Sequence, residues 1–427
     1  MGLGERIRRA RERVGLNQRQ LATLTGISQP TISRVESGGR STLAVTELHR
    51  IAMATGTTVT ALTGDTDGEA RILTAARIAA TGDPDAASTA ASAAAELLEL
   101  DAILDALSLP GRQERREPGV TVDQKGGPAA QARALATEIR RAHQLGYGPL
   151  SDVDDLIEQL TGVDVAHRDL GGASGFCAVD PDRGTAIVLI GTGPNETAER
   201  QRFTAAHELA HLLFPGDPKH HTPAGTARPA EEVRADEFAR HLLIPMEGVS
   251  SWLRANGVTE VTEAELAALA NTFRVSPRVA LIQLTKLGRA PAEVGEGSLP
   301  TGRQLAYRHG WGAAYDVAQL VAGTERPPVR MVDRATQAYR LGKLGLAPLA
   351  RLLGQSLREA EASLAEAGVM PVQRTSEHAV AAALSGHLMA GLAPDDEARE
   401  LVRKVVDGDL TADQVVDDLR AGLPTGG

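Results

Sequence analysis

Two histidines and a glutamate near the middle of the chain have the spacing of a catalytic metal-binding motif. His207, Glu208 and His211 form the pattern His-Glu-x-x-His. Residues four apart lie on the same face of a helix, so the two imidazoles could bind one metal ion. Glu208 would then point toward a water molecule on that ion, which is the arrangement of zinc hydrolases. The alternative is a helix that carries two ordinary histidines, and the surrounding residues must decide.

The residues around the motif predict a packed helix that could position it. Apolar side chains recur at helical spacing on both sides of the histidines: Phe203, Ala206, Ala210, Leu213 and Phe214. Asn195 is a candidate N-cap, and Pro215 followed by Gly216 should end the helix. The two histidines are therefore expected on a helix whose apolar side is buried.

A second helix, predicted over residues 230–245, offers a third metal ligand. Catalytic zinc usually takes three protein ligands and leaves one position for water. Glu232 and Asp236 share a face of this helix at a spacing of four. Glu232 could bind the metal while Asp236 accepts the free ring N–H of a ligating histidine, which fixes the orientation of the ring. Glu231 is the main rival for the ligand role.

Three short apolar runs before the motif predict a small β-sheet. They cover residues 162–165, 175–179 and 186–190, and residues 180–184 have the composition of a hairpin turn. An exposed edge strand beside the metal site could bind an extended peptide through main-chain hydrogen bonds. Cys177 lies on one of these strands and is interpreted as a small core residue. A single cysteine also excludes an internal disulfide and an iron–sulfur cluster.

Two further histidines, His220 and His221, lie between the two predicted helices. They could stabilise an oxyanion, but exposed loop histidines are the preferred interpretation.

The segments around the His-Glu-x-x-His motif and around the acidic motif of the second predicted helix resemble the ImmA/IrrE metallopeptidases. The resemblance rests on residues 201–211 and on the second motif, which runs from Glu232 to Pro245, and it extends over about residues 130–288. Members of that family are zinc endopeptidases that cleave a partner repressor and so induce mobile-element or stress genes. The resemblance implies Zn²⁺ held by His207, His211 and Glu232, Glu208 as the base, and a repressor-type protein as the substrate. The family often has Asn in place of Asp236.

The N-terminal residues 16–38 predict two helices joined by a tight turn at Gly26. The second helix should begin after Ser28, which can cap it, with Pro30 in the first turn. This is a helix-turn-helix pattern. The expected buried residues are Leu21, Ala22, Ile27, Ile32 and Val35, which leaves Gln29, Thr31, Ser33 and Arg34 on or near the exposed side. Gln and Arg can form paired hydrogen bonds with base edges in the major groove.

Residues 3–64 resemble the XRE, or lambda-repressor/Cro-like, DNA-binding family. The resemblance implies that Gln18 contacts the DNA backbone and supports the recognition helix, and that Gln29, Thr31 and Arg34 face bases or phosphates. Glu36 matches a structural glutamate of that family. The complete set of candidate DNA-contacting residues is Gln18, Ser28, Gln29, Thr31, Ser33 and Arg34. A double-stranded operator and a homodimer on a pseudo-palindromic site are the expected partners.

The charge distribution agrees with DNA binding by the N-terminal segment. Residues 1–65 contain nine Arg and five acidic residues, a net charge of +4 in a chain whose total is −10. Only this segment is therefore suited to phosphate, although the arginines of residues 6–13 could also form an ordinary solvated helix face.

Length and composition predict several domains in a cytoplasmic protein. A chain of 427 residues with 42% hydrophobic residues can form two to four domains with ample cores. The N-terminus lacks the apolar segment of a signal peptide, and the longest uncharged apolar stretch, residues 378–394, is too short to span a membrane. Forty of the 45 basic residues are Arg, which suggests a GC-rich bacterial genome.

The expected fold is multidomain and mainly α. We predict a helix-turn-helix bundle at 1–65, a helical connector at 66–108, a flexible linker at 109–128, an α+β zincin-like metallopeptidase domain at 129–290, and an all-α region of unknown role at 301–427. Within the peptidase domain, Thr262 with Glu265 forms a capping box and Ser276-Pro277 begins another helix, so residues 262–288 form a helical pair. This pair lacks polar recognition residues and is expected to support the peptidase.

Two functions from different classes fit these patterns. In the first, the chain is a DNA-binding regulator whose zinc endopeptidase domain cleaves a repressor-type protein. In the second, it is a regulator whose protease-like domain is a non-proteolytic sensor, with zinc structural or absent. Glu208 favours the first, because a structural metal site needs no base. An antitoxin-like autorepressor is a third alternative.

Overall fold

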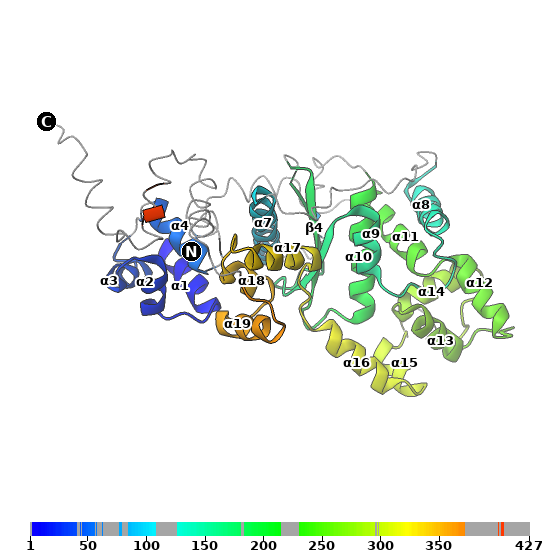
Figure 1. Cartoon of the computed structure of the whole chain (residues 1–427). Helices are drawn as coiled ribbons and strands as arrows, with labels where there is room; N and C mark the ends of the chain where they lie inside the picture. Colours follow the sequence, from blue (N-terminus) through cyan, green and yellow to red (C-terminus); the bar gives the residue numbers. More distant parts are fainter. Residues whose placement is uncertain are drawn as a thin grey trace. The chain divides into compact units, whose positions relative to one another are not determined.

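The computed structural model describes residues 2–40, 43, 45–55, 57, 62, 77–78, 84–107, 126–180, 183–214, 230–294, 297, 299–371, 400 and 403–404. They are mainly helical with one small sheet, as predicted (Figure 1). The chain divides into two compact units. Unit 1 consists of residues 1–66, 96–112 and 328–427, and unit 2 consists of residues 67–95 and 113–327. Among the helices that the structure describes, none has the length and hydropathy needed to cross a membrane.

Unit 1 contains the predicted helix-turn-helix. Its first four helices are α1 (Leu3–Arg13), α2 (Gln18–Thr25), α3 (Gln29–Glu36) and α4 (Val45–Thr55). Gly26 ends α2 with φ of 63°, a left-handed conformation that suits glycine, and the Ser28 hydroxyl accepts a hydrogen bond from the Thr31 amide at the start of α3. The predicted turn, cap and Pro30 position are therefore confirmed. The predicted core residues are also buried, except that Ala22 is only partly buried.

Gly4 allows α1 to lie directly against α3. A Cβ atom at this position would come within 1.9 Å of the Val35 carbonyl oxygen. Because no side chain fits there, glycine is required for the observed packing of these two helices. The sequence pattern did not indicate this contact.

Unit 1 also includes the C-terminal part of α7 (Pro84–Ala106), together with α17 (Val329–Arg340), α18 (Leu346–Leu352) and α19 (Leu357–Glu366). Arg334 of α17 is buried, and its guanidinium lies 2.5 Å from carboxylate oxygens of both Asp101 and Asp105. This ion pair fixes α17 on α7. The three helices α17, α18 and α19 fit the all-α prediction for the C-terminal region, of which residues 372–399, 401–402 and 405–427 fall outside the described residues.

Unit 2 contains a sheet with strand order β1-β3-β4-β2, made by β1 (Arg77–Ile78), β2 (Asp164–Arg168), β3 (Gly175–Asp180) and β4 (Thr185–Gly191). β3 and β4 form the predicted antiparallel hairpin, and β2 is parallel to β4. β2 begins two residues later than predicted. The prediction of helix for residues 66–108 is wrong at Arg77–Ile78, where main-chain pairing with β3 outweighs the helical tendency of an Ala-rich segment.

The outer sides of the predicted strands β3 and β2 are each partly paired with other parts of the chain. β1 pairs with Phe176 and Cys177 of β3. At the opposite edge, the main-chain groups of His167 and Arg326 exchange hydrogen bonds of 2.8 and 3.1 Å. The expectation of an exposed edge strand is therefore corrected at these positions, because the strand's own polar groups find partners within the fold.

Nine helices of unit 2 follow in chain order within the described residues: α8 (Pro128–Ala142), α9 (Val153–Thr161), α10 (Ala198–Leu213), α11 (Ala230–Leu243), α12 (Met246–Ala255), α13 (Glu263–Phe273), α14 (Pro277–Lys286), α15 (Gly302–Arg308) and α16 (Gly312–Ala322). The capping box of Thr262 with Glu265 and the cap at Ser276 are confirmed, and so is the helical pair α13 and α14. α15 and α16 belong to unit 2. The domain limits given above remain a prediction.

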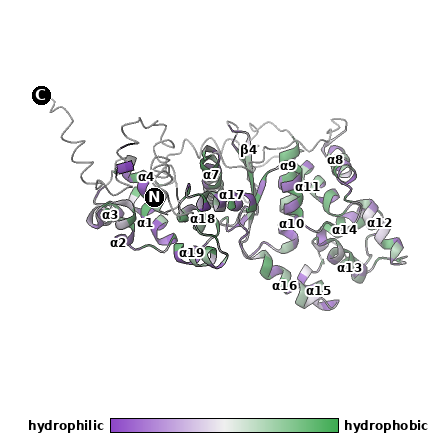
Figure 2. Cartoon of the chain, in the orientation of Figure 1, coloured by the Kyte–Doolittle hydropathy of each residue, from purple (hydrophilic) through white to green (hydrophobic). Residues whose placement is uncertain are grey.

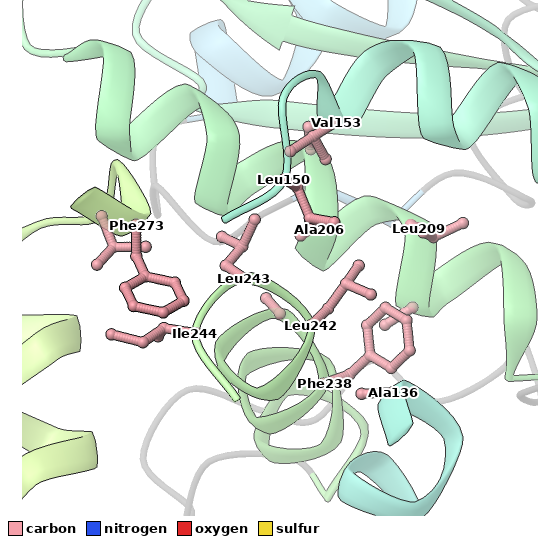
Figure 3. Packing of buried hydrophobic residues seen from close by; sticks show 14 of the residues in the cluster. Ala136, Leu150, Val153, Ala206, Leu209, Phe238, Leu242, Leu243, Ile244 and Phe273 are labelled. Carbon is pink, nitrogen blue, oxygen red and sulfur yellow. The ribbon is translucent and has the colours of Figure 1, made fainter. Parts of the chain in front are cut away.

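The core of unit 2 lies around α10 and α11. α10 packs against α9 and α11, and α11 also packs against α8 (Figure 1). Figure 3 shows Phe238, Leu242 and Leu243 of α11 beside Ala206 and Leu209 of α10. All five side chains are fully buried. The two helices that carry the candidate metal ligands are thus held in a fixed relation by a continuous apolar core.

A buried arginine strengthens the attachment of α8 to α11. Arg140 of α8 donates hydrogen bonds to the carbonyl oxygens of Leu242, at 2.8 Å, and Gly146, at 2.6 Å. Burial lowers the pKa of Arg140 to about 10, which still leaves the guanidinium charged at neutral pH. The bond to Leu242 satisfies a carbonyl group at the end of α11 that its own helix leaves without a donor.

Candidate metal centre and DNA interface

α10 carries the His-Glu-x-x-His motif and begins at Ala198. Its N-cap is Thr197, whose hydroxyl accepts a hydrogen bond from the Arg200 amide at 3.3 Å. The prediction of Asn195 as the cap is therefore wrong by two residues, because the chain enters the helix only after Glu196. The helix ends at Leu213, and the predicted stop at Pro215 lies outside the described residues.

His207, His211 and Glu232 converge in unit 2, where α10 faces α11. One possible ligand atom from each of the three residues lies within 4.8 Å of the other two. Glu232 approaches both rings, with oxygens 3.3 Å from His207 Nε2 and 3.4 Å from His211 Nε2. The two Nε2 atoms are 3.1 Å apart. Two ring nitrogens and a carboxylate that face one point can hold a divalent cation, and this is a ligand set that suits zinc.

Asp236 lies behind His207, one helical turn after Glu232. Its Oδ1 atom is 3.0 Å from His207 Nδ1, so the carboxylate can accept the N–H of the ring. This contact leaves His207 Nε2 directed at His211 and Glu232, which is the orientation a metal ligand needs. Glu231, the rival ligand, is not a member of the three-residue cluster.

Charges around His207 favour a protonated ring when no cation is present. Burial alone would lower the pKa of His207, but hydrogen bonds to Asp236 and Glu232 outweigh it and raise the pKa to about 10. Burial would raise the pKa of Glu232, yet its hydrogen bonds to both imidazoles hold it well below the usual range. The carboxylates around His207 therefore stabilise a positive charge at this point. A metal cation can take that place only if it displaces the proton from His207.

Glu208 is fully buried beside the two histidines. Its carboxylate lies under the start of β3, where a Cβ atom on Gly175 would be 3.3 Å from Glu208 Oε1 and 2.2 Å from Thr204 Cγ2. The second distance is far below van der Waals contact, so only glycine allows β3 to pass this close to α10. Gly175 is thus a site residue that the sequence analysis placed only in a strand.

Gly175→Ala is expected to destabilise unit 2 by about 1 to 3 kcal/mol, because the added methyl group must displace β3 or the Thr204 side chain. Gly193→Ala is a matched control, since a Cβ atom there meets nothing within 4 Å. Thermal unfolding of both variants would check this. Equal unfolding temperatures would contradict the close approach of β3 to α10.

Three further residues of unit 2 were singled out in the sequence: Cys177, His220 and His221. Cys177 is buried in the core cluster, as predicted. His220 and His221 lie outside the described residues.

The candidate DNA-contacting residues of unit 1 are linked to a buried ion pair. The Arg11 guanidinium donates to both carboxylate oxygens of Glu36, at 2.7 and 2.9 Å. Gln18 donates to Glu36 at 2.9 Å, and Gln29 donates to Gln18 at 2.9 Å. Glu36 therefore has the structural role inferred from the resemblance. Gln18 holds the side chain of Gln29 at the first position of α3.

The other candidates lie along the same helix. Arg34 and Ser28 are exposed, whereas Gln29, Thr31 and Ser33 are partly buried. The Ser28 and Thr31 hydroxyls are hydrogen-bonded at 2.8 Å, so Ser28 is engaged in capping α3. The side of α3 away from buried Ile32 and Val35 thus presents polar residues of the kind that read bases.

Known families match both regions. Residues 7–62 match the family described as Helix-turn-helix, and residues 159–285 match the family described as IrrE N-terminal-like domain. The chain therefore contains an XRE-type helix-turn-helix domain and an IrrE/ImmA-like peptidase domain, which confirms both resemblances.

Two relatives carry the name radiation response metalloprotease IrrE. The protein of Deinococcus deserti is 31% identical over 169 residues, which cover 37% of this chain and 58% of the relative. That of Deinococcus radiodurans is 29% identical over 162 residues, covering 36% of this chain and 47% of the relative. The chain thus spans about half the length of each of these relatives.

Proposed function

We propose that this chain, which joins a helix-turn-helix domain to an IrrE-like domain, is a bacterial transcription regulator with a zinc-dependent endopeptidase. The observation that carries the proposal is the convergence of His207, His211 and Glu232 beside the buried carboxylate of Glu208. A structural zinc site is usually closed by four ligands, whereas three ligands and a neighbouring acid suit catalysis. The metalloprotease relatives support the same activity.

In this proposal, His207, His211 and Glu232 hold the zinc ion, and Asp236 fixes the His207 ring through Nδ1. When bound, zinc supplies Lewis-acid chemistry, which polarises a peptide carbonyl and makes water easier to deprotonate. Glu208 takes the proton from the attacking water and can return it to the departing amine. The core around α10 and α11 keeps the carboxylate and the two imidazoles in this relation.

We propose a repressor-type protein as the substrate and a double-stranded operator as the DNA partner, bound by a homodimer in the bacterial cytoplasm. A DNA-bound endopeptidase would meet its substrate where a repressor also binds, which raises the local concentration of the two proteins. Cleavage would then change gene expression at a mobile element or in a stress response. If the domain is instead a non-proteolytic sensor, or the chain is an antitoxin-like autorepressor, regulation would not depend on Glu208.

The two activities should be separable by single substitutions, and this is the experiment that tests the proposal. Arg34→Ala should weaken operator binding and leave the zinc content unchanged. Glu208→Gln should keep both DNA binding and zinc but lose cleavage. A protein in which neither substitution changes expression of the regulated genes would contradict the proposed function.

For DNA recognition, Gln29→Ala is expected to change which operator sequence is preferred. A bidentate contact with one base pair contributes about 1 to 3 kcal/mol to discrimination. Arg34→Ala should weaken binding. If Arg34 contacts a phosphate, the slope of the logarithm of the binding constant against the logarithm of salt concentration should also become shallower by about one unit. Arg278→Ala on α14 is the matched control, because this exposed arginine belongs to unit 2. An unchanged footprint in both α3 variants would show that this helix does not read the operator.

A further inference from the structure

Unit 2 contains a pocket of about 660 Å³ that is separate from the metal centre. It is lined by the first turns of α9 and α10 and by parts of α13, α15 and α16, and none of His207, Glu208, His211 and Glu232 belongs to its wall. Pockets that bind small molecules have volumes of about 300 to 1,000 Å³. The proposed function assigns this pocket no role.

One part of the wall is apolar and includes an aromatic ring. The main contributors are Ala267, Ala270, Val275, Leu305 and Trp311. Figure 2 shows hydrophobic residues over most of α16, which continues this wall. Val317 and Val321 of α16 line the pocket and are 60% and 69% exposed. An apolar surface that remains this accessible is suited to the hydrocarbon or aromatic body of a ligand.

The charged part of the wall holds three arginines. Arg326 is bonded to Glu158 and Val165, whereas the other two have unused donors. Arg202 of α10 and Arg274 both donate to the Ser151 carbonyl, at 3.2 and 3.3 Å, and Arg202 also donates to the Leu150 carbonyl at 2.8 Å. The buried Nε of Arg202 has no acceptor among the described residues. For the Arg274 side chain, the bond to Ser151 is the one hydrogen bond within the described part of the chain. Asn271 lies on the same wall and adds an amide.

The three acidic residues of the pocket already have partners, and Glu199 accepts a hydrogen bond from Gln319 Nε2 at 3.4 Å. The Asp152 side chain accepts hydrogen bonds from the amides of Asp154 and Asp155, at 2.9 and 3.1 Å. Asp154 lies 2.8 Å from His167 Nε2. These carboxylates are therefore less available to a ligand than the guanidiniums. Burial lowers the pKa of Arg202, and the nearby charge of Arg274 lowers it further, while the charges of Asp152, Asp154 and Glu199 only partly offset this. An anion between the two guanidiniums would therefore still be favourable.

We propose that this pocket binds a small amphipathic anion, with its acidic group at Arg202, Arg274 and Asn271 and its apolar body against α13 and Trp311. A carboxylate can accept two hydrogen bonds from one guanidinium, which fits arginine better than any other cation. The ligand class is an aromatic or aliphatic acid small enough for 660 Å³. Such a molecule would contact α10 five residues before His207.

The test measures binding of naphthalene-1-carboxylate by calorimetry, with its neutral analogue 1-naphthalenemethanol as the comparison ligand. The carboxylate should bind at millimolar or lower concentration and more tightly than the alcohol. Arg274→Gln should weaken carboxylate binding about tenfold, because a charge-assisted hydrogen bond is lost, and should leave alcohol binding unchanged. Arg278→Gln, an exposed arginine outside the pocket, should bind the carboxylate like the wild type.

A second variant tests the apolar part without altering charge. Ala318 is exposed and lines the pocket, so Ala318→Trp should fill the entrance and abolish binding of both ligands. Ala313→Trp, on the same helix outside the pocket wall, is the control and should bind normally. Wild-type protein that binds neither ligand at 10 mM, on the order of the weakest useful affinity, would overturn the proposal. The proposal would also be overturned if Arg274→Gln and Ala318→Trp changed binding no more than their controls do. No step requires peptidase activity, so failure here and failure of the proposed function are distinguishable.

Discussion

Replacing either motif histidine by alanine is expected to reduce the zinc content of the purified protein from about one ion per chain to nearly none. His207 and His211 supply two of the three proposed ligands, and the two ligands that remain after either substitution cannot hold the ion tightly in competition with water. The folded wild type should also be stabilised by zinc. At a free zinc concentration of roughly 1,000 times the Kd, the gain in unfolding free energy is about 4 kcal/mol. Metal analysis and unfolding with and without zinc would measure both effects.

The neighbouring acids provide a matched pair for the same measurement. Glu232→Gln should lose zinc, whereas Glu231→Gln should retain it, because only Glu232 lies within reach of both imidazoles. If Glu231→Gln loses the metal and Glu232→Gln keeps it, the rival assignment of the third ligand is correct. Wild-type protein that stays free of divalent metal after zinc is supplied would remove the basis for a peptidase.

Glu208→Gln is expected to abolish induction of the regulated genes without loss of metal, fold or operator binding. The substitution keeps the size of the buried side chain and removes the base. General-base catalysis contributes about 10²- to 10⁴-fold to rate, so cleavage should fall by that factor. A reporter in the host, combined with chromatin precipitation and zinc analysis, would separate these properties.

The control for this variant is Glu247→Gln, because Glu247 is an exposed acid on α12 in the same unit. It should induce like the wild type. If Glu208→Gln also induces normally, the domain regulates without proteolysis and the sensor interpretation replaces the peptidase.

The sequence was sufficient to predict those parts of the site in which a short spacing on one helix determines which residues lie together. His207 with His211 and Glu232 with Asp236 are each four residues apart, and helical geometry alone places each pair on one face. The cap at Ser28 and the turn at Gly26 were predictable for a similar reason, since each depends on a local backbone conformation.

Features that depend on contacts between distant parts of the chain could not be predicted from the sequence. The helical interpretation of Arg77–Ile78 is wrong because this segment pairs with Phe176 and Cys177 of β3, which are distant in the sequence, and that pairing decides its conformation. Gly175 and Gly4 are required by the approach of Thr204 and Val35, which no local pattern reveals. The misplaced cap at Asn195 shows the limit at helix ends, where Thr197, two residues later, can also act as the cap.

The most direct test of the account compares new protein N-termini, by mass spectrometry, in host cells that produce either the wild type or Glu208→Gln at equal levels. At least one DNA-binding repressor should be cut at a single position in the wild-type cells and remain intact in cells with the variant. Identical sets of N-termini in the two strains, at a time when the wild type induces its target genes, would contradict regulation by proteolysis.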